Sequence, residues 1–162
     1  ILSSFCSLID KMLPEREVCK GFYNTCKIFL SDLTDDTIEI FFLIEKYIKW
    51  EISILSEVGV HLNLHSCTLS GSKNNLMYVS PTSGNAVSEE YSGKYLKKLI
   101  LLPNCLGGKY LLREKNIYDL LGGFDLTHYF LNKFFKNLDY KNLNSLFFAR
   151  TQLIENFKIK YF

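Results

Sequence analysis

One long apolar segment, residues 37–58, constrains the fold of this chain more than any other feature. Its side chains recur at the three- and four-residue steps of one helix face, at Phe41, Ile44, Ile48, Ile52, Leu55 and Val58, with further apolar residues on the other faces. A helix that is apolar on most sides must be surrounded by other elements. Gly59 then supplies a typical helix stop. The segment therefore predicts the central helix of a bundle.

Two helices are predicted before this segment. Apolar residues at helical spacing predict the first over residues 2–13, ended by Pro14, and the second from Cys19 or Lys20 to Leu33. Asp36, with Glu39 three positions later, resembles a capping box for the central helix.

After Gly59 the helical period is lost. Residues 76–80 and 86–88, separated by the turn residues 82–85, predict a β-hairpin. Four helical segments are expected afterwards, at residues 92–100, at 117–121 closed by Gly122 and Gly123, at about 126–135 and at about 146–157. We therefore expect one mainly α domain over residues 1–162, a helical bundle around a long central helix with a small hairpin insertion at about 60–90.

Composition narrows the class of protein. The 162 residues, 48% hydrophobic and 22% charged, fit a globular domain with a core of its own. No apolar run approaches the roughly 18 residues that a membrane span needs, and no secretory signal follows Ile1, so we expect no membrane partner. Five scattered cysteines without framework spacing favour free thiols and the cytosol.

The charges of the two halves differ in sign. Residues 1–60 hold 6 Lys and Arg against 10 Asp and Glu, whereas residues 61–162 hold 13 against 7. The two halves are therefore expected to face different partners.

The sequence resembles the recombination mediator family RecO. The resemblance is carried by Trp50-Glu-Ile-Ser-Ile-Leu-Ser-Glu-Val-Gly59, Leu64-His-Ser-Cys67, Gly71, Tyr78-Val-Ser-Pro-x-Ser-Gly84 and Leu101-Leu-Pro103. Leu13-Pro-Glu-Arg-Glu17 and Leu143-Asn-Ser145 also fit the family frame. Members of this family begin with an oligonucleotide-binding β-barrel, which has no counterpart here, so we expect the helical part of a truncated member.

The resemblance implies a protein that acts by binding. RecO proteins bind single- and double-stranded DNA, anneal complementary strands and work with RecR. They also help to load the recombinase RecA onto DNA coated by single-strand binding protein. No cofactor is implied.

Many relatives carry Cys-x-x-Cys twice in the hairpin, as a zinc site. The matching positions here are Cys67, Ser70, Ser88 and Tyr91, so three of the four thiolates that zinc would need are replaced. His61, His65 and Cys67 do not share a helical face after Gly59 and make a poor substitute. We expect no metal and a hairpin held by hydrogen bonds and apolar packing.

The densest basic region is the candidate DNA-binding surface. It consists of Lys94, Lys97, Lys98, Lys109, Arg113 and Lys115. Such residues neutralise DNA phosphates with little sequence preference, although a solvated helix face would look the same. Near the end, Leu143-Asn-Ser-Leu146 lacks an arginine that relatives often have after the serine, which removes one basic contact.

A partner-tail pocket is also implied. The C-terminal tail of single-strand binding protein is acidic and ends in an apolar residue, so its pocket needs a hydrophobic slot rimmed by Lys or Arg. The candidates are Phe130, Phe134 and Phe147 for the slot and Lys133 and Arg150 for the rim, although any of the phenylalanines would also fit a core position.

Glu51 lies beside the apolar face of the central segment and must be paired or reach solvent; an ion pair or a surface position is favoured over a functional acid. Gly107-Gly-Lys109 lacks the frame of a phosphate-binding loop, and no nucleophile has a recognisable base, so no enzyme is expected. A helical regulatory or interaction domain that meets only protein partners remains the alternative. The oligomeric state and the RecR docking surface stay open.

Overall fold

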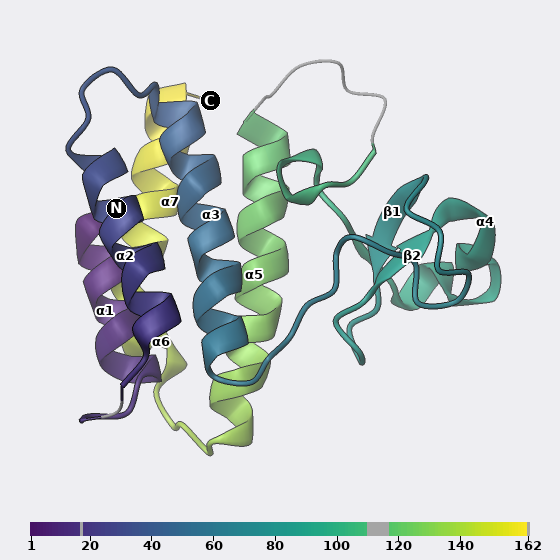
Figure 1. Cartoon of the computed structure of the whole chain (residues 1–162), viewed down its shortest axis with the longest axis horizontal. Helices are drawn as coiled ribbons and strands as arrows, with labels where there is room; N and C mark the ends of the chain where they lie inside the picture. The colour runs from purple at the N-terminus through teal and green to yellow at the C-terminus, as the bar shows by residue number, and fades with distance from the viewer. Residues whose placement is uncertain (17, 110–116, 162) are drawn as a thin grey trace.

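The computed structural model describes residues 1–16, 18–109 and 117–161. Its helical bundle contains α1 (Leu2–Met12), α2 (Lys20–Leu33), α3 (Ile40–Glu57), α5 (Ile117–Asn137) and α7 (Phe148–Tyr161). These helices run side by side, and the short α6 (Leu143–Leu146) precedes α7 (Figure 1). A small β-structure lies outside the bundle, beyond α5. The protein is therefore mainly α, as the sequence predicted.

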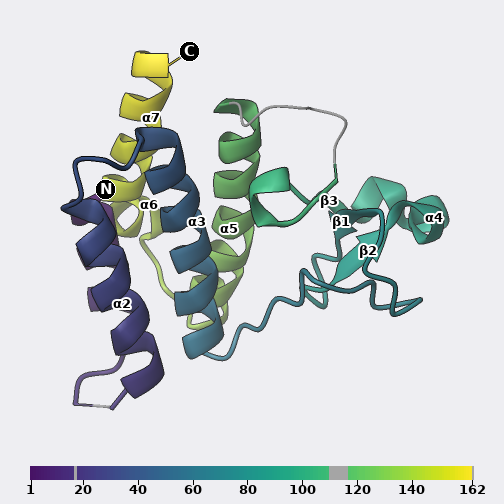
Figure 2. The ribbon, with the colours of Figure 1, turned by 45° about the horizontal axis from the view of Figure 1, so that its top comes forward.

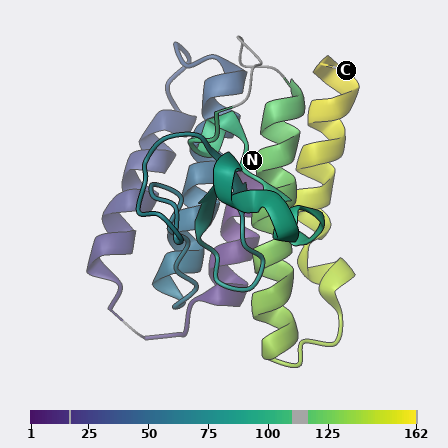
Figure 3. The same cartoon turned by 90° about the vertical axis from the view of Figure 1, so that its right-hand side faces the viewer.

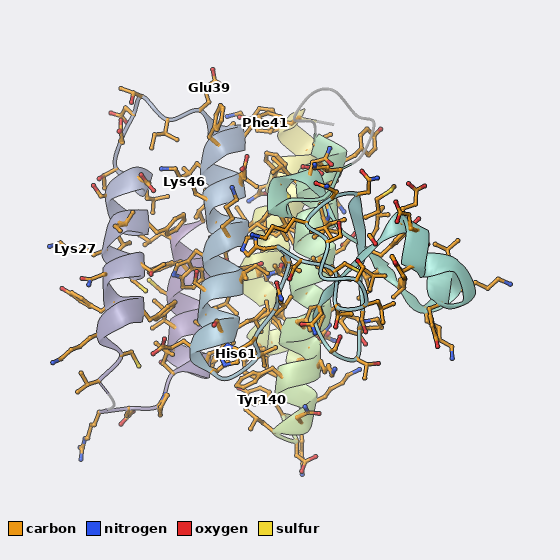
Figure 4. The ribbon with its side chains drawn as sticks, turned by 45° about the vertical axis from the view of Figure 1, so that its right-hand side comes forward. Lys27, Glu39, Phe41, Lys46, His61 and Tyr140 are labelled. Atoms are coloured by element: carbon orange, nitrogen blue, oxygen red, sulfur yellow. The ribbon has the colours of Figure 1, made fainter. Side chains whose placement is uncertain are left out.

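The apolar segment forms the central helix. α3 packs between α2 and α5, and Ile44, Ile48, Ile54 and Leu55 are fully buried (Figure 1). On the side that faces α2, Lys46 forms an ion pair with Asp32, 2.6 Å from Nζ to Oδ1 (Figure 4).

The predicted capping box is wrong. Glu39 is the N-cap residue of α3, and no side chain caps the helix with a hydrogen bond. The carboxylate of Asp35 instead accepts hydrogen bonds from the backbone N–H and the hydroxyl of Thr37, so a local turn precedes the helix.

An aromatic cluster joins the first three helices. The ring of Trp50 has its centroid 4.3 Å from that of Phe5, 5.7 Å from Tyr47, 6.0 Å from Phe22 and 6.1 Å from Phe29. Such pairs contribute roughly 0.5–1.5 kcal/mol each beyond their burial. The hydroxyl of Tyr47 is also bonded to Ser4 Oγ at 2.7 Å. The aromatic residues of α1, α2 and α3 thus fix this half of the bundle.

Residues 60–109, here called the excursion, leave the bundle between α3 and α5. They contain β1 (Leu76–Val79), β2 (Ala86–Ser88), α4 (Glu89–Ser92), the 3₁₀ helix η1 (Gly93–Lys98), β3 (Ile100–Leu101) and a second 3₁₀ helix, η2 (Asn104–Leu106). The hairpin of β1 and β2 is antiparallel as predicted, with Val79 opposite Ala86. β3 pairs with the other edge of β1, which gives the order β2-β1-β3.

The single helix predicted over residues 92–100 is not formed. The chain makes one α-turn and then a 3₁₀ helix, because Ile100 and Leu101 pair with Val79 and Tyr78 as β3. Sheet pairing to a distant strand thus overrides the local helical pattern.

In the turned views the excursion lies against the side of the bundle that includes α5 (Figures 2 and 3). Asp119 and Lys133 of α5 hold it there through hydrogen bonds. Asp119 accepts hydrogen bonds from the backbone N–H groups of Asn104 at 2.6 Å and Cys105 at 2.8 Å, which caps η2. Further along α5, Lys133 Nζ donates to the carbonyl oxygens of Pro81 at 2.8 Å and Thr82 at 3.1 Å.

The predicted helix end at Gly122 and Gly123 is wrong, because α5 continues through both residues. A Cβ atom on Gly123 would lie 2.9 Å from Cys105 Sγ and 3.0 Å from Ile48 Cδ1. The glycine therefore lets α5 approach α3 and η2 closely, and that close packing compensates for its low helix propensity.

Candidate functional site

The four positions for which the resemblance implied a degenerate zinc site, Cys67, Ser70, Ser88 and Tyr91, lie in the excursion. Cys67 is buried, and its sulfur accepts hydrogen bonds from the backbone N–H of Ser88 at 3.4 Å and from the Ser88 hydroxyl at 3.5 Å. Burial alone would raise the pKa of the Cys67 thiol. Hydrogen bonds from Ser70, Ser88 and the Leu69 N–H outweigh burial and lower the pKa to about 6. Hydrogen-bond donors thus surround the sulfur.

The remaining positions do not fit a metal. Serine hydroxyls are poor zinc ligands beside thiolates, and no hydrogen bond within the described residues joins Tyr91 to Cys67. Across the described ranges, no group of three or more His, Cys, Asp or Glu side chains is placed to hold a metal ion. Backbone bonds instead close the turn, from Cys67 N–H to Ser72 at 2.7 Å and from Thr68 N–H to Ala86 at 2.9 Å.

Three of the six candidate DNA-binding residues can be located. Lys97 and Lys98 lie on η1 and Lys109 lies at the end of the excursion, and all three are exposed. Arg113 and Lys115 lie outside the described residues, as does the side chain of Lys94. Sequence reasoning missed Lys73, which is exposed just before β1 in the same excursion.

Three of the five tail-pocket candidates line one hollow. Phe130, Lys133 and Phe134 come from consecutive turns of α5 and face a pocket of about 330 Å³. Its opposite wall consists of residues 59–61 and 82–84, and His61 lies below the end of α3 beside α5 (Figure 4). In this wall Gly84 has a left-handed φ of 73°, and a Cβ there would lie 3.1 Å from the His61 carbonyl oxygen, so glycine is favoured at this position.

The other two candidates lie in the interior. Arg150 is only 3% exposed and Phe147 only 4%. The Phe147 ring packs against the rings of His128 and Phe135. The assignment of Arg150 to the pocket rim is therefore wrong, since its guanidinium is held inside the bundle.

Arg150 belongs to a buried ion pair. Its Nε donates to Glu51 Oε1 at 2.6 Å and its Nη2 to Glu51 Oε2 at 2.9 Å, and Nη2 also reaches the Phe124 carbonyl at 2.8 Å. Thr127 donates its hydroxyl to the same carboxylate. Of the two alternatives favoured for Glu51, an ion pair or a surface position, the ion pair is confirmed, and it joins α3, α5 and α7. A carboxylate in an apolar helix indicated a cation, but nothing in the sequence identified Arg150.

A second, polar hollow adjoins the first. It is about 440 Å³ in volume and shares Lys133 and Asn137 with the first pocket. His128, Asn132 and Lys136 also line it, together with Asp125 and Tyr129. Lys133 therefore stands between an aromatic hollow and a polar one.

The described helices include none long and apolar enough to cross a lipid bilayer. No solved structure matches the chain.

Comparison with curated proteins finds relatives that share one name. The proteins called DNA repair protein RecO from Wolbachia pipientis (strain wPip) and Bartonella tribocorum are both 33% identical to this chain. The matches cover 81% and 93% of this chain but 54% and 58% of the relatives. The protein of that name from Rickettsia canadensis is 36% identical over 82% of this chain and 52% of its own length. The chain thus spans about half the length of these relatives.

The family described as "Recombination protein O C terminal" matches residues 1–132, which include all of the excursion and most of α5. The chain therefore belongs to this family, the C-terminal part of the recombination protein RecO.

Proposed function

We propose that this chain is the helical part of a DNA repair and recombination mediator that acts by binding and catalyses no reaction. In this role it binds single- and double-stranded DNA, anneals strands and works with RecR to load the recombinase RecA onto DNA coated by single-strand binding protein. The observation that carries the proposal is the family match over residues 1–132. The five free cysteines support a reducing compartment, so we place this activity in the cytosol.

The charges of the excursion support DNA binding. Lys73, Lys97, Lys98 and Lys109 are exposed, and no ion pair within the described residues engages any of them. Lysines without acidic partners can neutralise phosphates without first breaking a salt bridge, and binding by such residues weakens steeply with salt.

The first experiment measures DNA binding as salt is varied. Fluorescence anisotropy with a labelled single-stranded oligonucleotide and a duplex of equal length should give affinities that fall as salt rises. The triple variant K97A/K98A/K109A should reduce the slope of log affinity against log salt by about 2 on single strands. Lys27, exposed on α2 and pointing away from the excursion, provides the matched control K27A (Figure 4).

The same measurement separates the rival function. A helical interaction domain with only protein partners would bind neither oligonucleotide, or would bind both independently of salt. Either result would contradict the proposed DNA-binding role.

The pair of hollows on α5 supports a second part of the proposal, capture of the tail of single-strand binding protein. Phe134, which is half-buried, supplies an apolar floor for the last side chain of the tail, with the buried ring of Phe130 beneath it. Lys133 and Lys136 lie beside it for the terminal carboxylate and the acidic residues that precede it. Lys133 already donates to two backbone carbonyls, so its ammonium is held at the junction of the hollows.

A fluorescent peptide with the sequence of the tail tests this assignment. F134A and K136A should each weaken binding by about five- to tenfold, which corresponds to about 1 kcal/mol for one lost contact. K158A, on α7, is the control and should bind the peptide as the unmodified protein does. Unchanged affinity in both pocket variants would place the tail elsewhere.

A further inference from the structure

We propose that Tyr91 and Tyr95 form a stacking platform for the unpaired bases of single-stranded DNA, with the neighbouring lysines holding its phosphates. This inference rests on the proposed function, because it presupposes that the excursion meets DNA. It adds the form of DNA that is preferred and the side chains that select it.

The two rings are exposed and lie four positions apart in the segment that joins β2 to β3. Tyr91 is 47% exposed and Tyr95 59%. Within the described residues neither ring contacts another aromatic ring, whereas Trp50 alone contacts four in the bundle. Exposed aromatic faces are the feature on which successive bases of a single strand stack.

Positive charge lies next to these rings. In a 3₁₀ helix, side chains three positions apart eclipse one another, so Tyr95 and Lys98 project from the same edge of η1. Lys97 is exposed on the same helix. The only acidic residues of the excursion, Glu89 and Glu90, lie at the start of α4, where a carboxylate is favoured by the helix terminus.

The backbone that carries the rings is anchored to the sheet. Glu89 N–H donates to the Asn75 carbonyl at 3.0 Å, and Ser92 Oγ donates to the Glu89 carbonyl at 2.7 Å. After η1 the chain returns directly into β3, which pairs with β1. The rings are thus presented by an ordered turn, so little backbone entropy is lost when a strand binds.

Single-stranded DNA fits this surface better than a duplex does. Every unpaired base offers a π-face to a tyrosine, whereas the bases of a duplex are already stacked on each other. A duplex can use only the lysines. Loss of the tyrosines should therefore lower the affinity for single strands and leave duplex affinity unchanged.

The experiment compares a fluorescein-labelled oligothymidylate with a duplex of equal length on the whole chain. Y91A/Y95A should lower single-strand affinity at least tenfold, keep the salt slope and leave duplex affinity within about twofold. Y91F/Y95F keeps the rings and should bind like the unmodified protein. Y23A removes a tyrosine that is 66% exposed on α2 and is the matched control. Circular dichroism verifies folding.

A second readout does not depend on the alanine variants. A single strand that contains 2-aminopurine should lose fluorescence when the unmodified protein stacks its base. The platform would be overturned if Y91A/Y95A bound single strands within twofold of the unmodified protein, or if the unmodified protein did not quench the 2-aminopurine fluorescence. Salt-dependent binding by the unmodified protein would still uphold the proposed function in that case. If the unmodified protein binds neither oligonucleotide, both the platform and the proposed DNA-binding function are contradicted.

Discussion

At the scale of single residues, Cys67 shows how hydrogen bonds hold the turn that precedes the hairpin. Its sulfur accepts two hydrogen bonds from Ser88, one from the backbone and one from the hydroxyl. Serine at position 88 thus supplies two hydrogen-bond donors to the sulfur. The turn itself is closed by backbone bonds that need no metal.

The thiolate gives stability a pH dependence. The pKa of Cys67 is lowered from 9.0 to about 6 in the folded protein, so between these values the unfolded chain binds the proton more tightly. The stabilisation of the fold by the Cys67 thiolate should be complete above about pH 9 and lost as the pH falls through about 6. The free energy of unfolding, measured with urea across this pH range, should rise with pH in the unmodified protein, and this rise should be absent in C67S. The same pH dependence in both proteins would contradict the lowered pKa.

The Glu51–Arg150 pair should behave as a unit. Removal of one partner leaves a buried charge uncompensated, so R150M or E51Q should each lower the free energy of unfolding by about 3–5 kcal/mol. The double variant E51Q/R150M should lose less than the sum of the two. Urea denaturation of the unmodified protein, the two single variants and the double variant gives the coupling energy between the two side chains. Additive losses would show that the two side chains do not depend on each other.

At the scale of elements, α5 shows why local helix signals fail. Gly122 and Gly123 read as a stop, yet the helix continues because its buried face packs on α3 and η2. Propensity is worth at most about 1 kcal/mol at each glycine, whereas burial of a large apolar side chain is worth roughly 1.5–3 kcal/mol. Packing therefore decides the length of the helix.

Alanine at the two glycines should have opposite effects. At Gly122 a Cβ would make ordinary contacts with the ring of Pro103, at 3.5 Å from Cγ and 3.8 Å from Cβ, so G122A should stabilise the protein by up to about 1 kcal/mol through helix propensity. At Gly123 the crowding against Cys105 and Ile48 should outweigh that gain, so G123A should destabilise by about 1–2 kcal/mol. Thermal unfolding of both variants tests the contrast. Equal changes in the unfolding temperature of the two variants would refute the close packing at Gly123.

At the scale of the whole molecule, polar contacts near both ends of α5 hold the excursion to the bundle. Asp119 caps η2 and Lys133 binds the carbonyls of Pro81 and Thr82. The excursion, which carries the surface proposed for DNA, is therefore held by the same helix that lines the hollows proposed for a protein tail.

Lys133 should control the hairpin turn without affecting the bundle. K133M keeps the apolar stem but removes the two donated bonds, so backbone amides around Gly84 and Asn85 should exchange with solvent about tenfold faster. Amides of α3 should be unchanged. Hydrogen exchange measured by NMR or mass spectrometry distinguishes the two regions. Equal acceleration in α3 would show that Lys133 supports the whole fold.

The sequence by itself determined the bundle, the central position of α3, the hairpin of β1 and β2 and the family, because these follow from periodicity, turn residues and ordered motifs within short segments. It also indicated that Glu51 needs a partner. Only the tertiary structure decided that this partner is Arg150, that α5 passes through two glycines, that Ile100 and Leu101 form β3, and that Lys133 reaches a turn about fifty residues earlier. Each of these features depends on contacts between residues far apart in the chain. A local sequence pattern does not identify which distant side chain makes such a contact.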